Sequence, residues 1–96
     1  MIKHIVCFKF KNSTPELCEK AKEILLSMQG NVPMLRSIEV GIDVLHSERS
    51  YDAILQVTVD DMEALEAYQN DPYHCSVVKT FIHSVRESSV AVDYEI

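Results

Sequence analysis

The spacing of apolar residues changes repeatedly along this chain, and that change limits its fold more than any other feature. Apolar residues recur at every second position in four segments, residues 2–10, 35–45, 51–59 and 88–96. They recur at helical spacing in three others, residues 15–28, 61–69 and 73–85. Since alternation is typical of half-buried strands, the predicted order is β-α-β-β-α-β, with the second helical part divided at Pro72.

This order is that of a ferredoxin-like α+β fold, in which helices cover one face of a four-stranded antiparallel sheet. With 96 residues, the chain has room for a single domain spanning residues 1–96. Local signals support the helix ends: residues 12–16 supply a cap and a first-turn proline, Gly30 ends the first helix, and Asp60 or Asp61 caps the second. Gly41 is a candidate for a β-bulge in the second strand.

The predicted strands carry apolar residues on both faces. In the first strand, Ile5 and Cys7 lie opposite Val6 and Phe8. Helices can cover only one of these faces. The apolar residues on the other face therefore predict that a second sheet packs against it. A domain of this size also buries only about two thirds of its unfolded surface, which favours further burial by association. We therefore expect a homodimer whose two sheets face one another and enclose an interior.

Composition excludes several classes of partner. Nine Lys and Arg against fifteen Asp and Glu give a net charge of −6, which opposes binding to nucleic acid or to an anionic membrane. No apolar run approaches the roughly 20 residues of a membrane span, and residues 1–5 lack the pattern of a signal peptide. The cysteines Cys7, Cys18 and Cys75 form no C-x-x-C pair and are expected to be free thiols, so we predict a cytoplasmic protein.

Four segments of the sequence resemble one known family. They are residues 2–11 (IKHIVCFKFK), 32–41 (VPMLRSIEVG), 67–74 (AYQNDPYH) and 92–94 (VDY). In this order they are similar to the stress-responsive A/B barrel family over nearly the whole chain. The resemblance implies a dimeric α+β barrel, in agreement with the order of elements. The family includes plant stress-associated proteins, many bacterial members of unknown role, and a plant polyketide cyclase that performs a cofactor-free aldol condensation.

The same resemblance implies candidate site residues. In the cyclase, the catalytic pair is a tyrosine followed six residues later by a histidine, and the matching positions are Tyr68 and His74. A histidine of the cyclase pocket matches His4, a candidate ligand-binding residue, while Asp71 replaces a histidine of the family motif. A histidine suits proton transfer and a phenol can stabilise an enolate oxygen, so His74 is the candidate base and Tyr68 the candidate oxyanion donor. Each of the three also has a structural interpretation, as a packing or capping residue.

The predicted function is binding of a small, partly apolar ligand in the interior or a cleft, with acid–base chemistry of the cyclase, lyase or isomerase type and no cofactor. Two alternatives stay open: a non-enzymatic stress-related structural or assembly protein with a packed interior, and a haem- or quinol-handling oxygenase, which similar dimeric barrels provide. No metal site is predicted, because the histidines show no i, i+4 pair and residues 29–34 contain no acid. His46 and His83 are expected to be solvated or packing residues.

Overall fold

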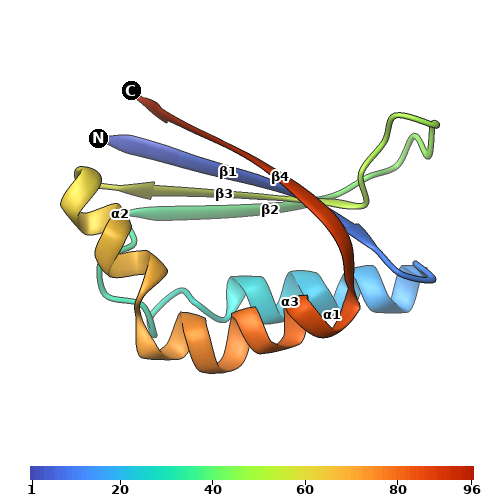
Figure 1. The fold of residues 1–96 in the computed structure, drawn as a ribbon, viewed down its shortest axis with the longest axis horizontal. Coiled ribbons are helices and arrows are strands. Elements are labelled where there is room, and N and C mark those ends of the chain that lie inside the picture. The colour runs from blue at the N-terminus through green and yellow to red at the C-terminus, as the bar shows by residue number, and fades with distance from the viewer.

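Four antiparallel strands form one sheet in the order β2-β3-β1-β4 in the computed structural model, which describes residues 1–96. The strands are β1 (Ile2–Phe10), β2 (Ser37–Ile42), β3 (Ala53–Val59) and β4 (Arg86–Glu95). The helices are α1 (Pro15–Leu26), α2 (Met62–Gln69), the π-helix η1 (His74–Lys79) and α3 (Thr80–Val85), which continues η1. Figure 1 shows the helices gathered on one face of the sheet, with both chain ends at the same side of the molecule. This arrangement confirms the predicted ferredoxin-like α+β fold.

The second strand is shorter than its sequence pattern predicts. Alternation continues to residue 45, whereas β2 ends at Ile42. Val44 and Leu45 lie in the connection to β3 and are 89% and 75% exposed. No strand pairs with this segment, so its alternation reflects no buried face.

The predicted bulge at Gly41 is wrong. Gly41 pairs with Ile54 in a regular antiparallel register, and a Cβ atom at Gly41 would lie 3.2 Å from the Ile54 side chain. The glycine therefore allows a close approach between neighbouring strands. The register shift of the sheet lies instead between Lys9 and Phe10, where β1 pairs with β4.

The predicted starts of the first two helices are confirmed. The Thr14 side chain accepts a hydrogen bond from the backbone N–H of Leu17 at 3.1 Å, and Asp61 accepts one from Ala64 at 2.8 Å. The predicted end of the first helix at Gly30 is wrong, because α1 already ends at Leu26 with Ser27 as its C-cap. Gly30 lies in the turn that follows and has a φ of 87°, a conformation that suits glycine. None of the helices combines the length and the apolar character that a bilayer-crossing segment needs.

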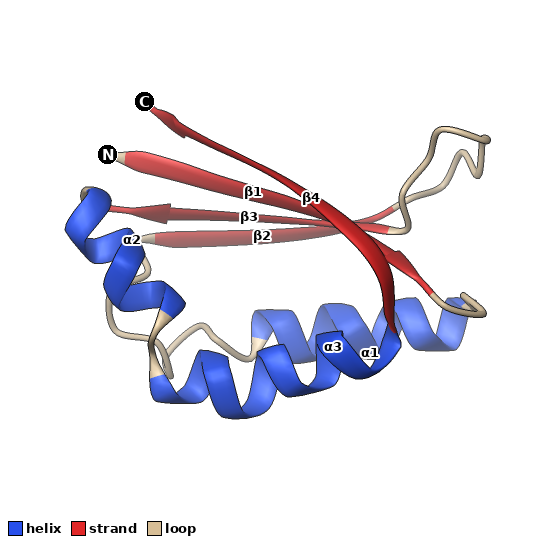
Figure 2. Ribbon diagram, viewed as in Figure 1, coloured by secondary structure: helices blue, strands red, loops and turns tan.

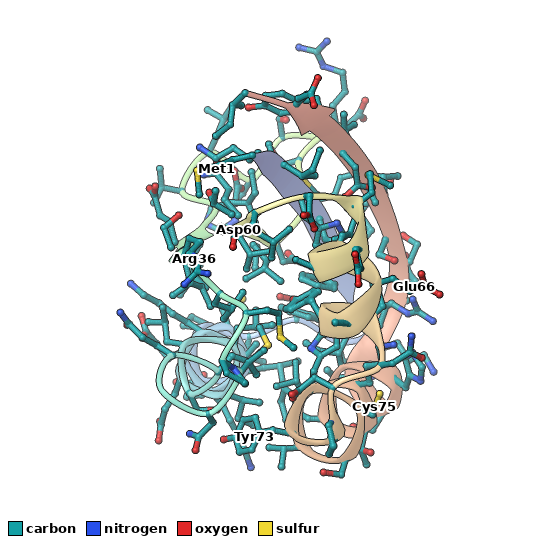
Figure 3. The ribbon with its side chains drawn as sticks, turned by 90° about the vertical axis from the view of Figure 1, so that its left-hand side faces the viewer. Met1, Arg36, Asp60, Glu66, Tyr73 and Cys75 are labelled. Atoms are coloured by element: carbon teal, nitrogen blue, oxygen red, sulfur yellow. The ribbon has the colours of Figure 1, made fainter.

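The hydrophobic core fills the space between the sheet and the helices. Its largest fully buried side chains are Leu25, Met28, Leu55, Val57, Val59, Tyr68 and Val78. Figure 3 shows the two long helical stretches end-on and side by side beneath the sheet, with Tyr73 between them. The Tyr73 hydroxyl donates a hydrogen bond to the Ser27 hydroxyl at 2.7 Å, which joins the two stretches.

The other face of the sheet, here called the open face, carries apolar side chains of β4. Val90, Val92 and Tyr94 pair with the residues of β1 that point away from the core. They are 49%, 62% and 45% exposed. Figure 2 shows that no helix covers this face. The strands thus have a second apolar face, as the sequence predicts, and this protomer leaves it uncovered.

Candidate ligand-binding site

A cavity of about 230 Å³ lies between the inner face of β1 and β4 and the helical stretch η1–α3. Its floor is buried and mostly apolar, and it is reached by three polar side chains, His4, Tyr68 and His74. Its rim is less buried and more polar, and includes Gln69, Lys79, His83, Arg86 and Ser89. The structure therefore brings together the three site residues predicted from the sequence. They meet between sheet and helices within one protomer, not on the open face.

His4 and Asp93 form a hydrogen-bonded pair across the sheet. The two residues are directly opposite in the antiparallel register of β1 and β4, so their side chains point to the same face. Nδ1 of His4 is hydrogen-bonded to Oδ1 of Asp93. Since an ionised carboxylate only accepts, Nδ1 of the neutral ring carries the proton and Nε2 keeps a free lone pair. The sequence interpretation assigned no role to Asp93.

Tyr68 is fully buried near the end of α2, between two histidine rings. Its ring centroid lies 5.7 Å from that of His4, edge-on, and 4.4 Å from that of His74, on which it stacks. Its hydroxyl faces the Met28 sulfur at 3.8 Å, and a thioether is a weak acceptor. Burial raises the pKa of Tyr68 well above its usual value. The phenol therefore keeps its proton at neutral pH and can donate it in a hydrogen bond.

His74 is the first residue of η1 and is buried. Its Nδ1 atom lies 3.1 Å from the sulfur of Met28. Burial lowers the pKa of His74 from 6.5 to about 4; the positive charge of Lys79, and that of His4 whenever its ring is protonated, act in the same direction, and Asp71 opposes them. The His74 ring is therefore neutral at pH 7.

Asp71 caps the helical segment that begins near His74. Its Oδ2 atom accepts a hydrogen bond from the backbone N–H of His74 at 3.0 Å, and its carbonyl oxygen accepts one from Cys75 at 2.9 Å. Pro72 follows it, in the first helical turn, where proline is favoured. The residue that departs from the family motif thus has a structural role: it orients the segment that carries His74.

The π-helix η1 determines which side chains face the cavity. Its i→i+5 hydrogen bonds make residues five apart neighbours on one face. His74 and Lys79 are five apart and both line the cavity. In a regular α-helix, residues five apart are rotated by roughly 140° and point in different directions. The sequence predicts a helix over residues 73–85, which is confirmed, but gives no sign of the π-helical turn.

The two remaining histidines differ in their relation to the cavity. His46 lies in the connection between β2 and β3, is exposed, and has Nδ1 3.6 Å from Asp43. It is a solvated residue, as predicted. His83 is also exposed but lines the cavity rim, which the sequence interpretation missed. Its spacing of four residues from Lys79 places both on one helix face and is the signal that could have indicated a shared site.

The cavity floor can support proton transfer. It combines a free imidazole lone pair on His4, a neutral imidazole on His74 and a phenolic donor on Tyr68 within a mostly apolar wall. Such groups can take up a proton and stabilise a developing oxyanion. No three His, Cys, Asp or Glu side chains converge in a way that could hold a metal ion.

Comparison with known families identifies the family of this chain. The sequence pattern described as "Stress responsive A/B Barrel Domain" matches residues 2–96. The chain belongs to the stress-responsive A/B barrel family. The resemblance carried by residues 2–11, 32–41 and 67–74 is thereby confirmed. Comparison with curated proteins finds no match.

Solved structures give this A/B barrel protein several neighbours. A protein from Bacteroides fragilis, described as dimeric, ferredoxin-like and of unknown function, is 26% identical over 99% of this chain and 95% of its own, with a TM-score of 0.85. A dimeric ferredoxin-like protein of unknown function from Thermobifida fusca is 25% identical over 99% and 90%, also with a TM-score of 0.85. The hydroxynitrile lyase from Passiflora edulis is 16% identical over 99% and 92%, with a TM-score of 0.82, and shares the fold.

Proposed function

We propose that this protein binds a small, partly apolar carbonyl compound in the cavity and moves a proton at the carbon next to the carbonyl group. The observation that carries the proposal is the convergence of His4, Tyr68 and His74 on a cavity of about 230 Å³ with a mostly apolar wall. A cavity of about 150 Å³ admits benzene, so this one has room for a single ring and a few further atoms.

His4 is the proposed base. Asp93 holds the proton on Nδ1, which leaves the lone pair of Nε2 to accept a proton from the ligand carbon. The electron pair of the broken C–H bond then moves to the carbonyl oxygen and gives an enolate. The Asp93 carboxylate stabilises the positive charge that His4 gains in this step, as in other carboxylate–histidine pairs.

Tyr68 is the proposed donor to the enolate oxygen. Its phenol is neutral at pH 7 and has only a weak sulfur acceptor in the free protein, so a stronger acceptor on the ligand can take its hydrogen bond. Return of the proton to a different atom gives an isomerase, while attack or cleavage at the enolate gives a cyclase or a lyase. The hydroxynitrile lyase from Passiflora edulis supports the lyase class, because it uses the same fold.

His74 is proposed to hold the ligand as a neutral hydrogen-bonding partner. The family resemblance gives it the role of base, but a pKa of about 4 makes it a weak proton acceptor. The positive charge of Lys79 nearby further disfavours a second positive charge on the His74 ring. The role of base and the role of ligand-holding partner predict different effects of replacing His74 alone.

Hydrogen–deuterium exchange tests the proposal. Phenylacetone in D₂O at pH 7 exchanges slowly at the carbons next to its carbonyl, and proton NMR follows the loss of signal. We expect the wild-type protein to accelerate exchange, and His4→Ala to lower the enzymatic rate by about 100-fold. Tyr68→Phe is expected to lower it by about 10- to 100-fold. His46→Ala is the matched control, since His46 lies outside the cavity.

The outcomes separate the roles of the two histidines. A rate for His74→Ala equal to that of the wild type would remove His74 from the chemical step, and an equal rate for His4→Ala would remove His4. Exchange no faster than in buffer, for a panel of single-ring ketones and β-dicarbonyl compounds, would overturn the acid–base function.

The protein is further proposed to act as a homodimer joined through the open face. Support comes from the exposed apolar side chains Val90, Val92 and Tyr94, and from similar structures described as dimeric. Pairing of two such faces would cover these side chains and complete a barrel of two sheets. Native mass spectrometry measures the stoichiometry directly, and a spectrum with monomer alone at micromolar concentration would contradict this part of the proposal.

A cytoplasmic location is part of the same proposal. Cys7, Cys18 and Cys75 are all free in the structure. Free thiols persist in reducing compartments, where disulfides are rare. Cell fractionation followed by immunoblotting would test the location, and recovery outside the cytoplasmic fraction would contradict it.

The alternative of a structural or assembly protein has less support. It expects the interior to be filled by side chains, whereas His4, Tyr68 and His74 face a cavity. A packed interior would also not require a hydrogen-bonded pair such as His4–Asp93. The cavity therefore favours ligand binding.

A further inference from the structure

The charged side chains that line the cavity are all of one sign, while the carboxylates of Asp93 and Asp71 lie behind His4 and His74 and are hydrogen-bonded to them. Two of the nine Lys and Arg side chains of this protein, Lys79 and Arg86, line the cavity, and none of its fifteen Asp and Glu side chains does. This is the reverse of the overall balance, since the chain has a net charge of −6. His83 lies on the same rim and adds positive charge when protonated. The rim is therefore an electropositive region on an acidic protein.

Lys79 and Arg86 have no carboxylate partner within the chain. The ion pairs of the structure join His4 to Asp93, Arg36 to Asp60, and His46 to Asp43. Lys79 donates one hydrogen bond from Nζ to the carbonyl oxygen of Gln69 at 2.7 Å, which leaves two N–H groups. Arg86 donates one from Nη1 to the Ser89 hydroxyl at 3.2 Å, which leaves most of its guanidinium group free.

The position of these two cations relative to the floor is set by the fold. The π-helical turn places Lys79 on the same wall as His74, and Arg86, the first residue of β4, also lines the cavity. Both side chains are partly buried, so solvent screens them less than a fully exposed cation. A molecule that fills the cavity would therefore contact both the polar groups of the floor and the two cations.

We propose that the ligand of this cavity carries an anionic head group, a carboxylate or a phosphate, bound by Lys79 and Arg86 at the rim. Its apolar body and carbonyl group then lie on the floor beside His4 and Tyr68. A guanidinium group and an ammonium group both form strong charge-assisted hydrogen bonds to such anions. This inference rests on the proposed function, because it names the substrate class of the same site.

Matched probes test the charge of the head group. Phenylpyruvate and phenylacetone share the ring and the ketone, and differ by a carboxylate in place of a methyl group. Isothermal titration calorimetry at about 50 mM salt is expected to show phenylpyruvate binding at least tenfold more tightly. Lys79→Met and Arg86→Met should each weaken phenylpyruvate about tenfold and leave phenylacetone within twofold, which also shows that the variants fold. Arg49→Met, an exposed arginine of the β2–β3 connection, is the control and should change neither affinity.

The measured affinities distinguish failure of the anionic head group from failure of the proposed function. Equal affinity for the two probes, unchanged in both rim variants, would overturn the anionic head while leaving ligand binding intact. Failure of both probes and of further single-ring ketones to bind would overturn the proposed function and this inference with it. Phenyl phosphate tests whether the head group is a phosphate. Binding that is tighter than that of phenylpyruvate and is lost in Arg86→Met would support a phosphate head group. Weaker binding than that of phenylpyruvate would support a carboxylate.

Discussion

The sulfur atom of Met28 lies 3.1 Å from Nδ1 of His74. Met28 is fully buried, and the same sulfur also faces the hydroxyl of Tyr68 at 3.8 Å. One thioether therefore contacts two of the three polar groups of the cavity floor. A hydrogen bond from Nδ1–H to sulfur would place the proton of the neutral ring on Nδ1 and leave Nε2 as the acceptor.

Replacement of this sulfur tests its role in orienting the two rings. Met28→Leu keeps the volume close to that of the wild type, so the loss of stability should stay below about 1.5 kcal/mol. The change should instead alter the tautomer of His74, seen in the side-chain ¹⁵N shifts, and lower ligand affinity. Met62→Leu, at a position that is 63% exposed, is the control. An unchanged ¹⁵N spectrum in Met28→Leu would show that the sulfur does not fix the ring.

The low pKa of His74 predicts a loss of stability in acid. Between pH 6.5 and about 4, the unfolded chain binds a proton at His74 that the folded protein does not, because burial and the charges of Lys79 and His4 outweigh Asp71. The contribution of the neutral ring is fully present above pH 6.5 and is lost as the pH falls, to a total of about 3 kcal/mol.

Urea unfolding of the wild type and of His74→Gln measures this contribution. Relative to the variant, the wild type should lose about 2 kcal/mol of unfolding free energy between pH 7 and pH 4.5. His46→Gln, which removes an exposed histidine, should follow the wild type. A constant difference between wild type and His74→Gln over this range would mean that His74 titrates alike in both states.

Asp93→Asn is expected to disturb the chemistry more than the fold. The Asp93 side chain is 38% exposed, so stability should change little, but an amide can donate to Nδ1 of His4 and favour the other tautomer. The rate of phenylacetone exchange should fall by about 10- to 100-fold. Asp43→Asn, beside the exposed His46, is the matched control. Wild-type exchange in Asp93→Asn would separate this carboxylate from the reaction.

The open face predicts a charge-sensitive dimer. Val92→Asp would place a carboxylate in the middle of the proposed interface, where burying it without a partner is unfavourable. Size-exclusion chromatography with light scattering should then show a monomer at concentrations where the wild type is a dimer. Val44→Asp alters a side chain that is 89% exposed on the β2–β3 connection and should remain dimeric. A dimeric Val92→Asp variant would place the interface elsewhere.

Much of the fold could be predicted from the sequence because the signal is local. The alternation in residues 2–10 and the helical spacing in residues 15–28 each record which face is buried. The end of β2 could not be predicted in this way. Val44 and Leu45 continue the alternation, but whether a partner strand reaches them is a property of the whole sheet.

The candidate site could be predicted only in part. His4, Tyr68 and His74 were found through the family resemblance, since their spacing alone is equally typical of core residues. Asp93 could not be assigned, because the register of β1 and β4 is what places it opposite His4. Lys79 depends on the π-helical turn, which no pattern of apolar residues reveals.

The π-helix η1 makes the length of this helical segment adjustable by one residue. A π-helical turn holds more residues than an α-helical turn, so deletion of one residue within residues 74–79 would allow regular α-helix to continue into α3. The segments before and after the deletion would keep their relative orientation, because the π-helical turn already accommodates one residue more than an α-helical turn. With the residue lost between them, His74 and Lys79 would be four residues apart and would still share a wall, since residues four apart lie on one face of a regular α-helix. The π-helical turn is therefore a place where this helix can lose one residue while both side chains keep their positions in the cavity wall.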